Sequence, residues 1–272
     1  MLIAQITDTH LVEKNCHWLS EPATETRERL LQAVHYINEL NPIPDIVILT
    51  GDATDTGSQE AYIHLKELLN HLKVPIYLIP GNHDDREQMR KAFSSSYMPK
   101  IGFLQYVIDN SSVRIICLDT LVEGKDHGLI CPERFCWLEK SLREKPEKPA
   151  LIFMHHPPAK TGFKLFDSML CNVPAQFESL IRNTKHLLGI YSGHYHHLCI
   201  TSYGGKACFI APSIAPIHYL AHPNDMHVTA LELEEPSVTL HFLNEDNIMT
   251  SQVTRIKQDF QRIDWKIIKN KF

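Results

Sequence analysis

The sequence has no C-x-x-C pair and no long apolar run, and each absence narrows what the chain can be. Its seven cysteines are an odd number scattered over 272 residues, which argues against both a zinc ribbon and a disulfide framework. We therefore interpret them as buried thiols of a reducing compartment. No apolar stretch approaches the roughly 18 residues that a membrane-spanning helix needs, and residues 2–6 lack the basic and apolar regions of a signal peptide. These absences predict a soluble, cytoplasmic protein.

The composition also has no excess that would set the chain apart from ordinary globular proteins. It is 43% hydrophobic and 22% charged, with 11 glycines and 16 prolines, which excludes disordered, collagen-like and low-complexity chains. The net charge of −5 does not indicate the basic surface that nucleic-acid-binding proteins use, so we expect no nucleic-acid partner. Histidine is abundant, with 17 copies. It is the commonest metal ligand and the usual proton carrier near neutral pH, so its positions indicate the chemistry.

Strand-like runs alternate with helical patterns from residue 2 to residue 191. We expect strands at residues 2–7, 45–50, 75–79, 104–108, 113–118, 150–154 and 187–191. We expect helices at residues 22–41, 59–72 and 132–144. The turn-forming residues 109–112 between two of these strands indicate a β-hairpin. This alternation predicts an α/β layer architecture.

Beyond Gly193 the pattern changes to consecutive strands. We expect them at residues 198–203, 206–211, 228–233 and 238–242. The Gly204-Gly205 step between the first two is a strong hairpin signal. We find no internal repeat and no long linker, so the sequence predicts one compact domain with a β-rich C-terminal end.

The tail from Thr250 to Phe272 combines basic charge with a regular apolar pattern. Six Lys or Arg residues accompany apolar side chains at Val253, Ile256, Phe260, Ile263 and Ile267. Spacings of three and four residues place these side chains along one stripe of a helix. The simpler interpretation is that the stripe packs on the protein itself or on a second subunit, as in a homo-oligomer. The alternative is a helix on a membrane surface, where basic amphipathic helices bind.

Polar side chains of metal-binding type follow five of the expected strands, at the point where each strand ends. The segments are Asp8-Thr9-His10, Gly51-Asp52, Gly81-Asn82-His83-Asp84, His155-His156-Pro157 and Gly193-His194-Tyr195-His196. In open α/β sheets the carboxyl ends of the strands form the ligand crevice. A single histidine at such a position is usually structural, but five such segments together predict one shared site.

The donor types indicate which ligand this site takes. Carboxylate, amide and imidazole groups without a thiolate suit Mn, Fe, Zn or Co rather than an iron–sulfur cluster. Seven candidate ligands are too many for one tetrahedral zinc ion, and they divide naturally between two metals if one carboxylate bridges them. Two metals roughly 3.5–4 Å apart clamp the attacking and leaving oxygens of a phosphoryl displacement. We therefore expect two divalent metal ions as cofactors.

These motifs, in this order, resemble the signature of the calcineurin-like metallophosphoesterases, and the resemblance runs from residue 2 to about residue 215. Within that superfamily the chain is most similar to the bacterial class III cyclic-nucleotide phosphodiesterases and their glycerophosphodiesterase relatives, on the segments 78–85 and 152–158. The resemblance implies a four-layer αββα sandwich of two mixed sheets flanked by helices. It also implies a catalytic domain over residues 1–215, followed by a β-rich extension and amphipathic tail over residues 216–272.

Roles for individual residues also follow from the resemblance. It implies that one metal is held by Asp8, His10 and His196, and that the other is held by Asn82, His155 and His194. Asp52 would bridge the two and act in catalysis. His83 would sit beside the phosphate as a catalytic residue and, with Asn82, would bind substrate. We interpret Asp84, His156, His197 and His218 as supporting groups rather than ligands.

The expected function is hydrolysis of small phosphodiesters, either 3',5'-cyclic nucleotides or glycerophosphodiesters, by direct attack of a metal-bridging hydroxide. The alternative is a phosphomonoesterase or nuclease on the same scaffold. Against a nuclease stand the net charge of −5 and the lack of a basic, aromatic-rich stripe. Against the sugar-lipid pyrophosphatase branch stands His83, where that branch typically has Arg. A non-catalytic scaffold is a third possibility, but such proteins usually lose metal ligands and none is lost here.

Charge counting predicts a preference for diesters. Two divalent cations carry four positive charges, from which Asp8, Asp52 and a hydroxide subtract three. A diester monoanion neutralises the remaining charge, whereas a monoester dianion leaves an excess that a low-dielectric site penalises. A basic side chain such as Lys160 or Lys164 reaching the pocket would remove this argument.

Overall fold

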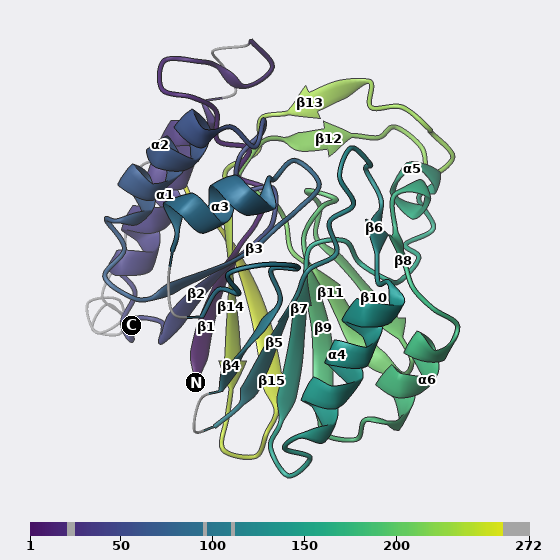
Figure 1. The fold of residues 1–272 in the computed structure, drawn as a ribbon. Helices are drawn as coiled ribbons and strands as arrows, with labels where there is room; N and C mark the ends of the chain where they lie inside the picture. The colour runs from purple at the N-terminus through teal and green to yellow at the C-terminus, as the bar shows by residue number, and fades with distance from the viewer. Residues whose placement is uncertain (21–24, 95–96, 110–111, 258–272) are drawn as a thin grey trace, which may run out of the picture.

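The computed structural model describes residues 1–20, 25–94, 97–109 and 112–257. They form two large β-sheets stacked face to face, with helices over both outer faces (Figure 1). The central strands of both sheets are apolar and almost fully buried because each sheet is covered on two sides.

The first sheet has the strand order β15-β14-β1-β2-β3. Its strands are β1 (Leu2–Ile6), β2 (Ile46–Thr50), β3 (Ile76–Ile79), β14 (Ser237–Leu243) and β15 (Met249–Arg255). The N-terminal strands β1, β2 and β3 are parallel, whereas β14 runs antiparallel to both β1 and β15. This sheet is therefore mixed, and the C-terminal strands complete it beside the first strand of the chain.

The second sheet has the order β10-β11-β9-β7-β5-β4. Its strands are β4 (Tyr106–Asp109), β5 (Arg114–Leu118), β7 (Ala150–Met154), β9 (Leu187–Ser192), β10 (Cys199–Tyr203) and β11 (Lys206–Ile210). The central strands β5, β7, β9 and β11 are parallel, and the edge strands β4 and β10 are antiparallel to their neighbours. Both sheets are thus mixed, as predicted.

Three apolar clusters hold the layers together. One fills the space between the sheets, with Ile48 from β2 and Phe153 from β7 among its members. Another packs the outer face of the first sheet against the helices α1 (Thr26–Asn38), α2 (Gln59–Leu69) and α3 (Arg86–Ala92). The third packs the second sheet against α4 (Pro132–Arg143) and α6 (Gln176–Asn183). The prediction of a four-layer αββα sandwich is confirmed.

Both predicted hairpins form. β4 and β5 pair antiparallel, and β10 pairs with β11 through Gly204 and Gly205. The φ angles of these two glycines are 56° and 76°, as a two-residue turn between twisted strands requires. The strand expected at 228–233 is shorter, β13 (Ala230–Glu232), and it pairs with β12 (Ile217–Tyr219) in a small hairpin outside both large sheets.

Several short elements were not predicted. They are α3, α6, β12, α5 (Lys164–Ser168), a 3-10 turn (Trp18–Ser20), β6 (Gly128–Leu129) and β8 (Cys171–Asn172). The helices among them have at most eight residues and the strands at most three, so none shows enough repeats of a hydrophobic period to be recognised.

The prediction of a helix beginning at Thr250 is wrong for its described part. Residues Met249–Arg255 form β15, whose seven residues pair with the whole of β14. The segment is rich in Thr, Ser and Val, which favour strands, and Ile256 becomes buried where the strand ends. The rest of the expected helix, residues 258–272, lies outside the described residues, so its partner stays a prediction.

All seven cysteines are free thiols, as predicted, but only Cys117, Cys171 and Cys208 are buried. Cys16 and Cys136 are exposed, so the expectation of uniformly buried thiols is wrong. Within the described ranges, no helix combines the length and the apolar character needed to cross a membrane.

Candidate active site

The five segments singled out in the sequence meet at one edge of the sandwich (Figure 1). They follow β1, β2 and β3 in the first sheet and β7 and β9 in the second. Two contacts join the sheets here. The backbone N–H of His194 lies 2.9 Å and 3.1 Å from the two carboxylate oxygens of Asp8, and Nδ1 of His155 lies 2.7 Å from the carbonyl oxygen of Thr50. The site therefore spans the seam between the two sheets.

The backbone is strained at this edge. Five of the predicted site residues have a positive φ, namely Asp8 (50°), His10 (42°), Asp52 (46°), His194 (78°) and His196 (60°). A left-handed conformation costs a non-glycine residue roughly 1–2 kcal/mol, and such strain clusters at functional sites. Hydrogen bonds hold the loops in place, for example from the N–H of Asp8 to the carbonyl of Gly51 (3.0 Å).

Asp8, His10 and His196 form one buried group of possible metal ligands. Nδ1 of His196 lies 2.9 Å from the carbonyl oxygen of Pro216, which can only accept, so this nitrogen carries the proton. Nδ1 of His10 lies 2.9 Å from the carboxylate of Asp55. Both Nε2 lone pairs then point inward, 3.1 Å from one another. Two facing lone pairs beside the carboxylate of Asp8 are a donor set that fits a cation.

A second group lies around His155. Its Nδ1–H donates to the Thr50 carbonyl, and its Nε2 faces Oδ2 of Asp52 and Oδ1 of Asn82, both at 3.2 Å. When Nε2 is deprotonated, these three atoms all offer lone pairs to the same point. His194 is buried nearby, and its Nε2 has no hydrogen-bond partner among the described residues. A buried polar atom without a partner is costly, and a metal ion here would satisfy it.

Asp52 lies between the two groups. Its Oδ2 is 3.2 Å from Nε2 of His155 and 3.7 Å from Nε2 of His10. Its other oxygen, Oδ1, accepts the backbone N–H of His83 at 2.9 Å. One carboxylate thus faces both sets of imidazole nitrogens, which is the position a bridging ligand needs.

Burial and mutual charge set the protonation of the site. Burial raises the pKa of the Asp8 carboxyl to about 6. Burial acts in the same direction on Asp52, but the neighbouring His155 outweighs it and the pKa of Asp52 falls well below its ordinary value. Desolvation opposes the charged form of His155, yet the Asp52 carboxylate raises its pKa to about 9. The pocket therefore attracts positive charge, whether from protons or from metal ions.

Two of the other rings are neutral. Burial lowers the pKa of His194 and of His196 well below the ordinary value of histidine. The neutral imidazole is the form that binds a metal, since a protonated ring has no free lone pair.

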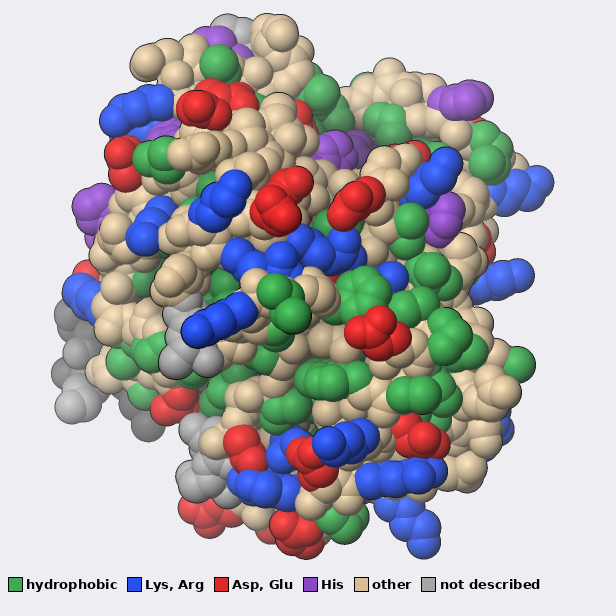
Figure 2. Space-filling model, viewed as in Figure 1, with side chains coloured by type: hydrophobic (Ala, Val, Ile, Leu, Met, Phe, Trp, Pro, Cys, Tyr) green, Lys and Arg blue, Asp and Glu red, His purple; other side chains and the backbone are tan. Residues whose placement is uncertain are grey.

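A cavity of about 220 Å³ opens over these groups. Its lining residues are His10, Trp18, Leu19, Asp52, Asp55, Asn82, His83, Asp126, Met169, His194, His196 and His218. Figure 2 shows histidine side chains in a hollow between the helical side of the first sheet and the β12–β13 hairpin. Among the described residues that line this cavity there is no Lys or Arg, and neither Lys160 nor Lys164 reaches it.

His83 stands at the mouth of the cavity, with 40% of its side chain exposed. Its Nδ1 lies 2.9 Å from the carbonyl oxygen of Asp55 and so carries a proton. The remaining nitrogen, Nε2, is left for a bound molecule. The ring also meets His10 edge-on, at 4.7 Å between centroids.

The residues that we interpreted as supporting groups form hydrogen bonds within the chain. The Asp84 carboxylate accepts the N–H groups of Gly81 (2.9 Å) and Ala53 (3.1 Å) and the hydroxyl of Tyr62 (2.7 Å), so it ties two site loops together. Nε2 of His197 donates to the carbonyl of His218 at 2.6 Å.

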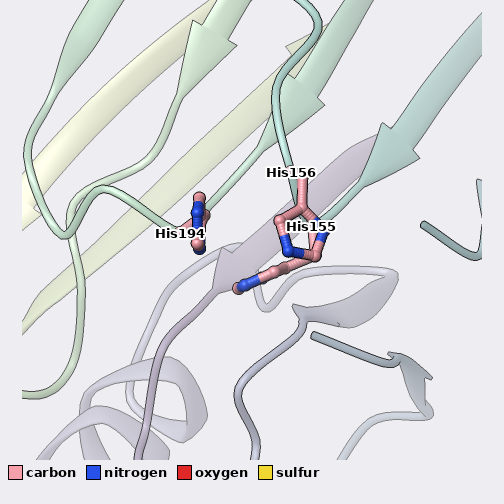
Figure 3. A group of neighbouring side chains, drawn as sticks. All are labelled: His155, His156 and His194. Carbon is pink, nitrogen blue, oxygen red and sulfur yellow. The ribbon is translucent and has the colours of Figure 1, made fainter. Parts of the chain in front are cut away.

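His156 is closer to the metal-type residues than expected. Its Nδ1 lies 2.7 Å from the hydroxyl of Thr120. Its Nε2 has no partner in the described part of the chain. His156 also belongs to a buried trio of possible ligands with His155 and His194. Figure 3 shows this trio, with the two adjacent rings at the end of β7 and His194 at the end of β9.

Five residues that line the cavity were missed in the sequence, namely Trp18, Leu19, Asp55, Asp126 and Met169. Asp55 binds Nδ1 of His10 and accepts the indole N–H of Trp18 at 2.9 Å. Trp18 stacks on the His10 ring at 5.0 Å between centroids. Asp55 had one usable signal, because it follows Asp52 by three residues in the same loop. Trp18 lies in an irregular segment with no signal.

The chain belongs to the calcineurin-like phosphoesterase family, whose model matches residues 1–198. It is 33% identical over 259 residues to a probable glycerophosphodiester phosphodiesterase GpdQ of Arcobacter nitrofigilis, covering 94% of this chain and 93% of the relative. It is 26% identical over 256 residues to the 3',5'-cyclic adenosine monophosphate phosphodiesterase CpdA of Escherichia coli strain K12, covering 93% and 89%. The predicted family and the prediction of an enzyme are both confirmed.

A solved structure supports the fold. A dimetal phosphatase from Danio rerio superposes with a TM-score of 0.67 at 15% identity, covering 94% of this chain and 99% of that protein. At this low identity the likeness concerns the arrangement of sheets and helices.

Proposed function

We propose that this chain hydrolyses small phosphodiesters with the help of two divalent metal ions. The substrates we propose are 3',5'-cyclic nucleotides or glycerophosphodiesters, the classes named in its relatives CpdA and GpdQ. The observation that carries the proposal is the pair of inward-facing ligand groups with Asp52 between them.

The residues present fit two cations. One would be held by Asp8, His10 and His196, the other by Asn82, His155 and His194, with Asp52 shared. The nitrogen and oxygen donors of these groups accept Fe, Mn, Zn or Co, so they do not select a single metal. Bound there, two divalent cations supply Lewis acidity at the phosphoryl group and lower the pKa of water enough to give a nucleophile near neutral pH.

The protein's own groups hold and orient this arrangement. The Nδ1 protons of His155 and His196 are bound by the carbonyls of Thr50 and Pro216, so both rings keep Nε2 free and aimed inward. Asn82 offers a neutral amide, which we propose also binds the phosphate. His83 stands at the mouth with its Nδ1–H bound to the Asp55 carbonyl. As the imidazolium, with a second proton on Nε2, it would stabilise charge on the phosphate or protonate the departing alkoxide.

The charge of the pocket favours a diester over a monoester. The ionisable residues that line it, apart from histidines, are the acids Asp52, Asp55 and Asp126. No guanidinium or ammonium group in the described lining compensates the second negative charge of a monoester. Lys160 and Lys164, which could have supplied one, lie elsewhere.

A matched substrate pair tests this proposal. With metal-reconstituted protein, kcat/KM is measured for an aryl phosphodiester and for the aryl phosphomonoester with the same leaving group. We expect the diester to react faster. A faster monoester would favour the phosphomonoesterase alternative, and a preference for oligonucleotides over both would favour the nuclease.

A further inference from the structure

A chain of hydrogen-bonded polar groups runs through the apolar layer between the sheets, just beneath the proposed active site. Its members are the side chains of Gln5 on β1, Thr50 on β2, His241 on β14 and Ser251 on β15, together with the backbone carbonyl of Ser192 on β9. Gln5 is 1% exposed, and Thr50, Ser192 and His241 are fully buried. Polar groups in such a layer are costly unless they are paired.

Gln5 is the centre of this chain. Its side-chain Nε2 donates to the hydroxyl of Thr50 at 2.8 Å and to the carbonyl of Ser192 at 3.0 Å. Thr50 belongs to the first sheet and Ser192 to the second. One amide group therefore cross-links the two sheets.

His241 sets the orientation of that amide. The Nε2 hydrogens of Gln5 point to Thr50 and Ser192, so its Oε1 faces the opposite way. This oxygen accepts a hydrogen bond from Nε2–H of His241 at 2.9 Å. Nδ1 of His241 then accepts the hydroxyl of Ser251 at 2.8 Å.

The surroundings hold His241 in this state. Tyr191 and Phe209 meet its ring at 4.6 Å and 5.5 Å between centroids. Burial lowers the pKa of His241 to about 3, so the ring is neutral at physiological pH.

The cross-linked positions are the last residues of their strands. Thr50 precedes Gly51-Asp52, and its carbonyl also accepts Nδ1–H of His155. Ser192 precedes Gly193-His194. A shift of one sheet against the other would therefore move Asp52 and His155 relative to His194.

We propose that Gln5 and His241 form a clamp, the Gln5–His241 clamp, that fixes the spacing of the two sheets and so positions the ligand groups contributed by each. This inference rests on the proposed function, because it concerns the affinity of that site for metal. It assigns a positioning role to β14 and β15, strands that lie outside every motif of the sequence. Neither residue lines the cavity.

The test uses His241→Phe, whose ring suits the aromatic surroundings but cannot donate to Gln5. His241→Gln is the rescue variant, since its amide N–H replaces the lost donor. Val238→Ala is the control, because Val238 is buried on the same strand but packs on the opposite, helix-facing side of the sheet. Each protein is measured for Mn²⁺ affinity by competition with a fluorescent chelator, for thermal unfolding without metal, and for kcat and KM.

We expect His241→Phe to bind Mn²⁺ about 10-fold more weakly, since loss of groups that orient metal ligands costs roughly 10–100-fold. Its kcat should fall while KM stays close to wild type, and its unfolding temperature without metal should fall as in Val238→Ala, because the buried Oε1 of Gln5 loses its donor. His241→Gln should recover most of the affinity. Val238→Ala should unfold at a lower temperature but bind Mn²⁺ as tightly as the wild type.

Wild-type affinity and kcat in His241→Phe would overturn the clamp, and so would an equal loss of affinity in Val238→Ala. A wild type that binds Mn²⁺ but cleaves no diester would contradict the proposed function alone, because the affinities of the variants still decide the clamp.

Discussion

At the scale of single residues, the site is defined by which histidine ring nitrogens are hydrogen-bonded to the protein and which face inward. The carbonyls of Thr50 and Pro216 take the Nδ1 protons of His155 and His196. The remaining lone pairs face Asp52, Asn82 and Asp8. Residue type and position at strand ends were enough to predict that these side chains lie together at one site. The contributions of Asp55 and Trp18 could not be predicted, because they arise from packing of a loop with no regular pattern.

Asp52 is the residue on which both proposed metal sites depend. Replacing it with alanine removes the carboxylate oxygen that lies 3.7 Å from Nε2 of His10 and 3.2 Å from Nε2 of His155. We expect Asp52→Ala to lose occupancy at both sites, measured by metal analysis after dialysis. Two metals retained per chain would remove the bridging assignment.

His83 is expected to act on the leaving group. General acid catalysis is worth about 10²–10⁴ in rate, and its benefit grows as the leaving group becomes more basic. His83→Ala should therefore lose most on diesters with poor leaving groups, while metal content stays unchanged. The measurement is kcat/KM over a series of aryl and alkyl leaving groups. An equal loss across the series would contradict the assignment.

At the scale of elements, the central strands were predicted well because each is a continuous apolar run that is buried on both faces. The short helix α3 and the three-residue strand β12 were not predicted, because they hold too few turns or pleats to show a period. The tail was misread because the spacing between Val253 and Ile256 fits a helix, while the register against β14 is visible only in the folded sheet.

Gly193, which follows β9, lies too close to the side chains of Thr7 and Asp8 to leave room for a side chain of its own. A Cβ at Gly193 would lie 1.9 Å from the hydroxyl oxygen of Thr7 and 2.6 Å from a carboxylate oxygen of Asp8. We expect Gly193→Ala to lose about 1–3 kcal/mol of unfolding free energy through overpacking, together with metal binding at the Asp8 group.

Gly205→Ala is the matched control for that variant. Gly205 has a positive φ, of 76°, which Gly193 does not, and a Cβ at Gly205 meets no atom within 4 Å. It should lose stability through backbone strain alone and keep the metal affinity of the wild type. Urea unfolding and chelator competition on both variants decide between the two outcomes, and equal metal affinities would refute the steric argument.

At the scale of the whole molecule, the edge opposite the site carries a separate ion-pair cluster. The Asp109 carboxylate contacts Lys145, Lys148 (2.7 Å) and Arg114 (3.1 Å). Hydrogen bonds from the two lysines lower the pKa of this carboxyl to about 2. A depressed pKa means that the stabilisation is complete above the unfolded value near 3.8 and is lost as the pH falls towards 2.

Asp109→Asn tests this cluster. Allowing for solvent screening at a partly exposed site, we expect it to lose about 1 kcal/mol of unfolding free energy at pH 7. The difference from wild type should shrink by roughly half near pH 3, while activity at pH 7 is unchanged. Urea unfolding across this range is the measurement. A difference that stays constant with pH would show that the charge of Asp109 is not responsible.

The central claim is that two metal ions, held across the seam between the sheets, perform the hydrolysis. The most direct measurement is titration of metal-free protein with Mn²⁺ while hydrolysis of an aryl phosphodiester is followed. We expect no activity in the metal-free protein and a rise that saturates at two equivalents of Mn²⁺ per chain. Hydrolysis without metal, or saturation at one equivalent, would contradict the account.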